Sequence, residues 1–128
     1  MKKKFLIVVA NYYKDISKGL LLSSKKLIPK GSKLKIIEVP GVFEIPMTIK
    51  KNIKRYDAFI ALGCVIKGQT PHFDFISQAS INAIMSLSID NKKPIGNGII
   101  TCLSLKQAKV RKKKGAEATK AVLSILSQ

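Results

Sequence analysis

The chain of 128 residues has few of the residues that usually hold metal sites or disulfide-rich domains together. It has no tryptophan, one histidine and two cysteines, and Cys64 and Cys102 lie far apart without a CxxC spacing. A disulfide framework and a Cys/His zinc site are therefore both disfavoured. We expect both thiols to be buried and reduced, which indicates a cytoplasmic protein.

Long apolar segments are missing as well. The apolar run at 5–10 is far too short to cross a membrane or to form the core of a signal peptide, so we expect no membrane partner. With 46% hydrophobic and 24% charged residues, the chain is neither disordered nor fibrous. Its length predicts one domain that spans residues 1–128.

Acidic residues are scarce, because 24 Lys and Arg stand against seven Asp and Glu, for a formal net charge of +17. This charge first suggests nucleic acid, an anionic membrane surface or a phosphorylated substrate as a partner. However, only Arg55 and Arg111 are arginines, and the lysines are dispersed along the chain, whereas specific nucleic-acid readers favour arginine. We therefore interpret most of the charge as solvated surface lysine and expect no nucleic-acid partner.

Apolar runs and helical periodicities alternate along the chain. The apolar runs predict buried strands at 5–10, 34–39, 58–66 and 95–101. Helices are predicted at 15–27, at 43–53 and from about 70 to 89, and a last helical region from 104 to 126 is interrupted near 112–115. This order predicts an α/β fold, a three-layer α/β/α sandwich with a four-stranded parallel sheet of the flavodoxin-like type.

Three helix starts carry recognisable signals. Pro46 is compatible only with the first turn of its helix. Thr70 and Pro71 fit the cap and first position of the next helix, and Ser104 with Gln107 forms a capping-box pattern.

The unusual residues of the chain gather in four segments, 11–13, 40–44, 67–72 and 101–111, each directly after a predicted strand. Ligands of parallel α/β sheets bind beyond the carboxyl ends of the strands. The sequence therefore predicts a functional site where these segments meet.

One of these segments combines an anion site with a titratable group. Gly68, Gln69 and Thr70 stand at a helix start, where free N–H groups and the helix dipole attract anions, although an ordinary helix cap is the alternative. The P-loop pattern is absent. His72 would lie in the first turn, where the dipole favours a neutral imidazole able to accept or donate a proton; a capping or surface role is the alternative.

The other segments offer complementary chemistry. Tyr12 is suited to stack on a flat heterocycle or to pack at the sheet edge. Glu44 is suited to bind sugar-like hydroxyls or to cap the next helix. Arg111 and the lysines at 112–114 are suited to clamp a phosphate or to form a solvated face.

Two longer motifs, VPGVFEIP (39–46) and LGCVIKGQTPHFD (62–74), resemble the two signatures of the lumazine synthase family. The resemblance continues through GNGIIT (96–101), QAKVR (107–111) and KGAEA (114–118), and it covers nearly the whole chain. It implies a transferase of riboflavin biosynthesis that condenses 5-amino-6-(D-ribitylamino)uracil with 3,4-dihydroxy-2-butanone 4-phosphate. The resemblance implies no metal and no organic cofactor.

The resemblance also assigns roles to twelve residues. They are His72 for proton transfer; Tyr12, Cys64, Val65 and Ile66 around the heterocycle; Val42, Phe43 and Glu44 along the ribityl chain; Gln69, Thr70 and Arg111 at the phosphate; and Asn97 in the pocket wall.

The same resemblance implies a homo-oligomer. The family forms pentamers, some of which build capsids of twelve pentamers, with the active site between neighbouring subunits. The residues from Tyr12 to His72 would come from one subunit, and Asn97 and Arg111 from the next. We expect a pentamer or a multiple of pentamers. Because the first predicted strand begins almost at residue 1, a sixty-subunit shell is disfavoured.

The chain departs from the family pattern at three places. Asn97 stands where many members have Phe, and Tyr13 stands where Asn is frequent. The spacer between Arg111 and Lys114-Gly115 is several residues shorter than usual, so Lys114 is left out of the predicted site.

Two other classes of protein remain as alternatives. A non-catalytic homologue that carries lumazine or flavin is disfavoured by the presence of His72 and Arg111, which simple binding does not need. A phosphoacceptor receiver domain needs acidic residues clustered at strand ends, whereas Asp57 lies at a strand start.

Overall fold

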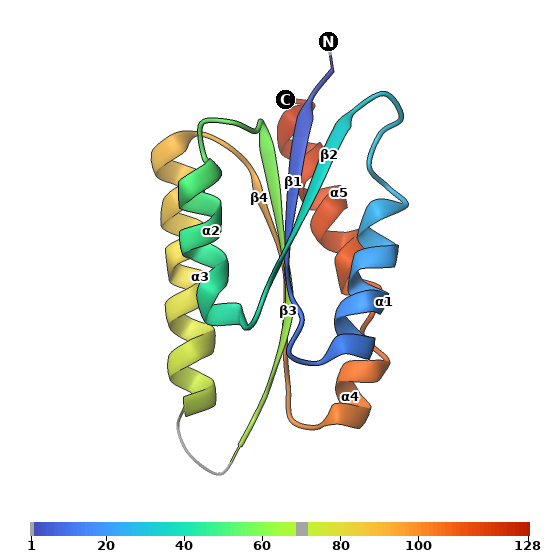
Figure 1. The fold of residues 1–128 in the computed structure, drawn as a ribbon, viewed down its shortest axis with the longest axis vertical. Coiled ribbons are helices and arrows are strands. Elements are labelled where there is room, and N and C mark those ends of the chain that lie inside the picture. Colours follow the sequence, from blue (N-terminus) through green and yellow to red (C-terminus); the bar gives the residue numbers. More distant parts are fainter. Residues whose placement is uncertain (1, 69–71) are drawn as a thin grey trace.

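A four-stranded parallel sheet runs through the middle of the molecule, with the strands in the order β2-β1-β3-β4 (Figure 1). The strands are β1 (Lys4–Ala10), β2 (Lys33–Val39), β3 (Ala58–Ile66) and β4 (Ile95–Cys102). The four predicted strands differ from these bounds by at most one residue at either end. The structure is a computed structural model that describes residues 2–68 and 72–128.

Helices cover both faces of the sheet, which confirms the predicted three-layer α/β/α fold. Helices α2 (Ile45–Asn52) and α3 (His72–Asn91) lie on one face, and α1 (Lys14–Lys25), α4 (Leu105–Lys109) and α5 (Lys114–Leu126) lie on the other (Figure 1). Within residues 2–68 and 72–128, no helix combines the length and the apolar character that crossing a membrane requires.

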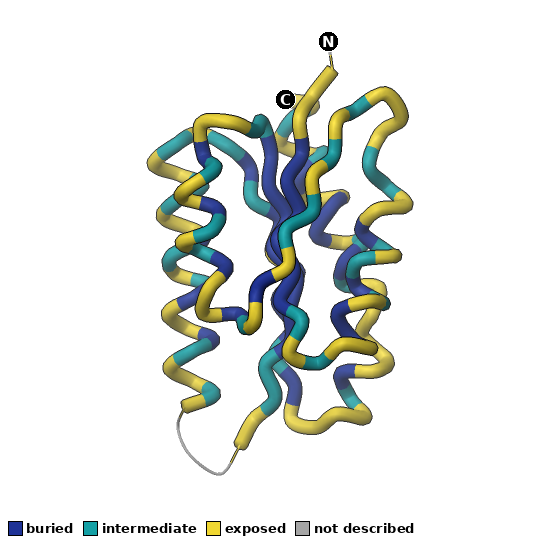
Figure 2. Tube along the Cα trace, in the orientation of Figure 1, coloured by how far each residue is buried: buried dark blue, intermediate teal, exposed yellow. Residues whose placement is uncertain are grey.

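The two faces of the sheet carry separate apolar clusters, and this explains the uninterrupted apolar runs. In β1, Phe5, Ile7 and Val9 belong to the cluster that contains residues of α1 and α5, while Leu6 and Val8 belong to the cluster with residues of α2 and α3. Because successive side chains of a strand point to opposite faces, a strand covered on both sides must be apolar throughout. Figure 2 shows this buried centre along β1 and β3.

The predicted helix at 43–53 consists of two elements. A single 3-10 turn, η1 (Val42–Glu44), precedes α2, and Pro46 lies at the start of α2 as predicted because a helix start leaves its N–H positions unbonded. The described part of α3 begins at His72, so the predicted capping by Thr70 and Pro71 lies outside the described residues.

The helix interruption predicted at 112–115 extends two residues too far, because α5 begins at Lys114 and contains Gly115. A Cβ atom on Gly115 would lie 2.1 Å from the carbonyl oxygen of Leu20, so glycine allows α5 to pack directly against α1. Ser23 of α1 reinforces this contact, donating to the carbonyl of Lys112 at 2.7 Å and accepting from the N–H of Ala116 at 3.1 Å. The start of α5 is thereby fixed against the second half of α1.

The predicted capping box of α4 is confirmed, with one shift of position. Ser104 Oγ accepts from the N–H of Gln107 at 3.1 Å, and Gln107 Oε1 accepts from the N–H of Leu103 at 2.7 Å. The glutamine therefore reaches the residue before the cap, not the cap itself. This short capped helix leads the chain from β4 to Arg111.

Candidate active site

The carboxyl ends of all four strands lie at one end of the molecule, which is the lower end in Figure 1. The loops that follow the strands are held to neighbouring strands, since the N–H of Asn11 donates to the carbonyl of Val39 and the N–H of Lys67 donates to that of Cys102, both at 2.9 Å. The parallel topology therefore brings the described parts of the four sequence segments to this end.

A cavity of about 350 Å³ opens at this end, and we call it the strand-end pocket. Its walls come from the loop after β1, from η1, from the end of β3 and from the first turns of α3. They include seven of the twelve predicted residues: Tyr12, Val42, Phe43, Cys64, Val65, Ile66 and His72. Three separate chain segments and a helix start therefore converge on one pocket, although they are distant in sequence.

Tyr12 presents a free aromatic surface at this pocket. Its side chain is 75% exposed, and its ring meets the edge of the Tyr13 ring at a centroid distance of 4.9 Å and an angle of 81°. Burial, followed by the nearby Tyr12 and Cys64, raises the pKa of Tyr13 above its usual value of 10.0. Tyr12 is thus not packed at the sheet edge, which was the alternative, and its exposed ring is available for stacking.

Cys64 contributes a buried wall to the strand-end pocket and is not suited to act as a nucleophile. Only 6% of the residue is exposed, and burial, with a smaller effect of the neighbouring Cys102, raises the pKa of its thiol to about 12. Because the thiolate is the reactive form, the thiol is inert near neutral pH. The β3 end therefore contributes shape and main-chain groups to the pocket.

Close packing on Gly63 brings η1 to the pocket. A Cβ atom at Gly63 would lie 2.7 Å from Val42 Cγ2, so the glycine lets Val42 settle on β3. Val42 is buried, whereas Phe43 and Glu44 are exposed. The 3-10 turn thus fixes the position of two exposed side chains beside the cavity.

Glu44 lies at the rim and does not line the strand-end pocket. Its carboxylate folds back over Gly41, because a Cβ atom on Gly41 would lie 3.1 Å from Glu44 Oε1. Its side chain makes no capping hydrogen bond to α2, so the alternative of a helix cap is not realised. Gln69 and Thr70, the predicted phosphate-binding pair, lie outside the described residues.

A second cavity, of about 530 Å³, lies beside the edge strand β4, and we call it the edge pocket. Asn97 of β4, Arg111 and Lys114 line it together. Arg111 Nη1 donates to the carbonyl of Thr101 at 3.4 Å, and Asn97 Oδ1 accepts from the N–H of Ile99 at 3.0 Å. With the shorter spacer after Arg111, Lys114 still lines the same cavity as Arg111.

The two pockets have no lining residue in common, so one chain does not bring His72 and Arg111 into the same cavity. The fold explains this separation. His72 starts the helix that covers one face of the sheet, whereas Arg111 follows the short helix α4 on the other face. Each chain thus carries the two groups of predicted residues in two separate cavities.

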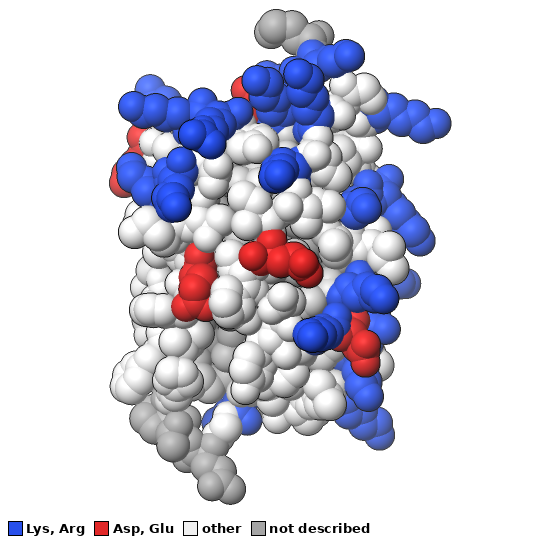
Figure 3. Space-filling view, in the orientation of Figure 1, with Lys and Arg blue, Asp and Glu red and all other residues white. Residues whose placement is uncertain are grey.

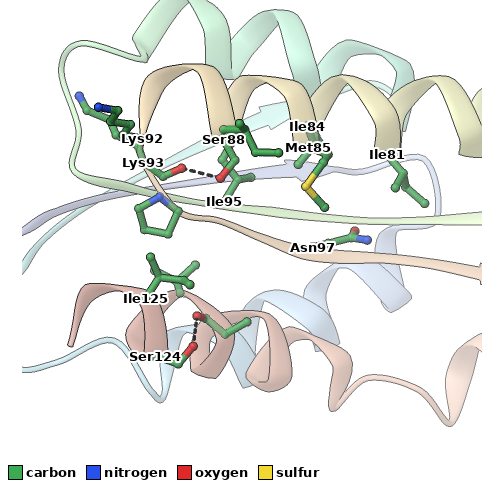
Figure 4. Close-up of a pocket in the computed structure, with 14 residues that line it drawn as sticks. Ile81, Ile84, Met85, Ser88, Lys92, Lys93, Ile95, Asn97, Ser124 and Ile125 are labelled. Carbon is green, nitrogen blue, oxygen red and sulfur yellow. Dashed lines mark hydrogen bonds between the residues drawn. The ribbon is translucent and has the colours of Figure 1, made fainter. Parts of the chain in front are cut away.

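An apolar groove of about 570 Å³ continues the edge pocket along β4, and Ile81 and Asn97 line both cavities. In Figure 4, Ile84 and Met85 extend from α3 and Ile125 extends from α5 into the space beside β4. Met85 and Ile125 are exposed. This apolar edge borders the pocket that contains Arg111.

Sequence reasoning missed several wall residues. Tyr13, Gly41, Phe73 and Ile76 also line the strand-end pocket, and Glu117 lines the edge pocket. Ile76 could have been found, because it stands four positions after His72 and therefore on the same helix face. Among the described residues, no cluster of three or more His, Cys, Asp and Glu side chains is placed to hold a metal ion.

Comparison with known proteins gives one consistent family. The family model described as 6,7-dimethyl-8-ribityllumazine synthase matches residues 2–128. A protein named 6,7-dimethyl-8-ribityllumazine synthase from Methylorubrum populi is 39% identical over 97% of this chain and 81% of its own length. The synthase of that name from Zymomonas mobilis is 39% identical over 97% of this chain and 94% of its own length. A third, 6,7-dimethyl-8-ribityllumazine synthase 1 from Rhodopseudomonas palustris, is 41% identical over 96% of the chain and 83% of its own length.

Proposed function

Because this chain belongs to the 6,7-dimethyl-8-ribityllumazine synthase family, we propose that it condenses 5-amino-6-(D-ribitylamino)uracil with 3,4-dihydroxy-2-butanone 4-phosphate. The products are 6,7-dimethyl-8-ribityllumazine, inorganic phosphate and water, in the penultimate step of riboflavin biosynthesis. The protein is thus a transferase that acts on small molecules, and we place it in the cytoplasm, in keeping with its two free buried cysteines.

The observation that carries this proposal is the strand-end pocket, where an exposed aromatic ring, a histidine and the end of a buried strand meet. The pyrimidinedione ring stacks on Tyr12 and lies along the main chain of Cys64, Val65 and Ile66. The ribityl chain runs past Val42 and Phe43 to the carboxylate of Glu44, which accepts hydrogen bonds from hydroxyl groups.

His72 is the proton-transfer residue in this account. The amine of the pyrimidine attacks the ketone of the four-carbon substrate, water and phosphate leave, and the ring closes. Each step moves a proton, and an imidazole can both accept and donate one near neutral pH. Holding the two small substrates together in one pocket supplies much of the remaining acceleration.

Arg111 binds the phosphate of the four-carbon substrate, together with Gln69 and Thr70. A guanidinium pairs with phosphate through two parallel N–H donors and stabilises the charge on the departing group. Its position in the edge pocket, away from His72, supports a site completed by a second copy of the chain. In this arrangement, Asn97 and Arg111 of one subunit face the strand-end pocket of its neighbour.

We therefore also propose a homopentamer, or a multiple of pentamers. Its support is the exposed apolar groove beside β4, which borders the edge pocket and would be covered by a neighbouring subunit. A subunit that uses one edge to meet the next subunit's strand-end pocket makes a head-to-tail contact, and such contacts form a ring when the rotation between subunits closes.

The direct test mixes the protein with both substrates and follows the fluorescence of the lumazine. We expect formation of the lumazine well above the uncatalysed rate, and no acceleration would refute the enzymatic function in favour of a carrier of lumazine or flavin. Light scattering on the same preparation tests the assembly, since a fully active monomer would contradict the shared site.

A further inference from the structure

The end of the molecule opposite the strand-end pocket carries most of the positive charge. Four segments lead into the strands there, 2–4, 25–35, 50–57 and 90–93, and together they contain fourteen of the 24 basic residues but only two of the seven acids. This basic end therefore accounts for +12 of the net charge of +17. On the face drawn in Figure 3, basic side chains crowd the end that carries the N-terminus.

The fold, and not the sequence, creates this concentration. The N–H of Lys33 donates to the carbonyl of Lys3 at 3.0 Å, and the N–H of Asp57 donates to the carbonyl of Lys4 at 2.8 Å. On the far side of β3, the N–H of Phe59 donates to the carbonyl of Pro94 at 3.0 Å. The four basic segments thus lie side by side across the starts of the four strands, although in sequence they looked dispersed.

Contacts and helix dipoles within the fold do not account for the positive charge of the basic end. Helices α1, α2, α3 and α5 all end near these segments, and each helix end carries about half a negative charge, or about two charges in total. Lys93 has a structural contact, because its Nζ donates to the carbonyl of Ile53 at 2.6 Å. The other thirteen basic residues of this end are exposed. The carboxylate of Asp57, one of the two acids, accepts from the N–H of Lys4 at 2.8 Å.

We propose that this basic end binds the phosphate backbone of double-stranded nucleic acid without reading its sequence. Strand starts are about 4.8 Å apart, so the row of four spans about 15 Å, and a duplex of that length carries about nine phosphate charges at one per about 1.7 Å. Lysines are point charges that suit a phosphate backbone, and Arg55 is the one arginine of this end. This proposal replaces the expectation drawn from the dispersed lysines of the sequence.

The surface chemistry favours nucleic acid over a membrane or an acidic protein. Tyr56 is the one aromatic residue of the basic end, and it is partly buried, with its ring 6.2 Å from that of Phe59. The exposed aromatic side chains of the described ranges, Tyr12, Phe43 and Phe75, lie at or near the other end. The basic end thus lacks the aromatic anchors that insert into a lipid interface or form the core of a protein interface.

The test compares two variants of equal charge. The first replaces Lys3, Lys33, Lys54 and Arg55 of the basic end with Gln, and the control replaces Lys14, Lys18, Lys106 and Lys109 with Gln, so both carry +13. All eight side chains are exposed. Fluorescence anisotropy then measures binding to a labelled DNA duplex of about 20 base pairs between about 50 and 200 mM salt.

We expect wild-type binding to weaken with salt with a logarithmic slope of about −4 to −5, which corresponds to about five phosphate contacts. The first variant should lose at least about tenfold in affinity and show a shallower slope, while the control stays within about twofold of wild type. Thermal melting checks that both variants are folded. If the first one is not, the single variants decide: Arg55→Gln should make the salt slope shallower by about 1, and Lys109→Gln should leave it unchanged.

Three outcomes would overturn the proposal. Equal losses in both variants would mean that net charge alone attracts DNA. No binding at the lowest salt would remove the nucleic-acid partner. Tighter binding to phosphatidylglycerol vesicles than to DNA, lost in the first variant, would assign the surface to a membrane. None of these results depends on lumazine formation, so the catalytic proposal is tested separately.

Discussion

The strand-end pocket and the edge pocket differ in how much of a site each contains. The first combines an aromatic surface, a histidine and a buried strand end, whereas the second offers a guanidinium, a lysine and an amide at an open sheet edge. The first is suited to hold a heterocycle and move protons, and the second is suited to bind a phosphate. In the proposed function, the chemistry is divided between these two surfaces, which a single chain keeps apart.

The edge position of β4 makes this division possible. β3 has a neighbouring strand on each side, so only its end is open, while β4 has one free edge along its length. A pocket on a free edge is open to another molecule along the strand, whereas the strand-end pocket is open only beyond the end of the sheet.

The largest effect should come from the proton-transfer residue of the strand-end pocket. His72→Ala should lower kcat by about 10²- to 10³-fold and change KM little, because general acid-base catalysis contributes on this scale. Steady-state kinetics with both substrates measures it. Gln78→Ala, an exposed change on the same helix outside the pocket, is the control and should retain wild-type activity. A KM effect without a kcat effect would assign His72 to binding.

Arg111→Ala, in the edge pocket, should give a different kinetic signature. Loss of a charged hydrogen-bonding group costs about 1.5–3 kcal/mol, so KM for the phosphorylated substrate should rise about 10- to 100-fold. KM for the pyrimidine should stay nearly constant, Arg111→Lys should restore part of the loss, and Lys109→Ala should have no effect. Equal increases in both KM values would contradict a dedicated phosphate role.

Tyr12→Leu should have a smaller effect, confined to the pyrimidine. Aromatic stacking is worth about 0.5–1.5 kcal/mol, so KM for the pyrimidine should rise by up to about tenfold. Tyr13→Phe keeps the neighbouring ring and serves as the control. An unchanged KM for Tyr12→Leu would mean that the heterocycle does not lie on this ring.

The thiol of Cys64 should be almost unreactive at neutral pH. Burial raises the pKa of its thiol to about 12, so its protonated form persists above pH 9.0, the usual pKa, in the folded state. The stability linked to this proton is present below pH 9 and lost as the pH rises towards 12. A thiol reagent at pH 8 should therefore modify neither buried cysteine of the native protein but both in urea. Rapid modification of the native protein would contradict this environment.

The sequence predicted the strands closely because each one is an apolar run bounded by turn residues. The start of α5 was missed, because Gly115 was interpreted as a helix breaker, whereas it permits close packing against α1. The turn η1 was missed because a 3-10 turn before a proline-containing helix has the same apolar pattern as the helix. Both misses depend on tertiary contacts, which periodicity does not report.

The grouping of the candidate residues was expected from two sources, strand-end topology and the family resemblance. Tyr12 and His72 follow strand ends, and topology alone indicates that they lie together. The resemblance assigned Arg111 to a different subunit from His72, and in the structure Arg111 lines the edge pocket, apart from His72. The shape and the other wall residues of the two cavities depend on tertiary packing and required the structure. The basic end is a similar case, because dispersed lysines became neighbours only when the strands aligned.

Complementation between two impaired variants tests the central claim of a shared site most directly. His72→Ala and Arg111→Ala chains are co-expressed in equal amounts, purified as mixed oligomers and assayed at a concentration of the phosphorylated substrate well below KM, where each variant alone is strongly impaired. If each site takes His72 from one subunit and Arg111 from the next, about one quarter of the sites in a random mixture are intact, and activity should return to about that fraction. Activity no higher than the mean of the two variants would place both residues in one chain's site and contradict the account.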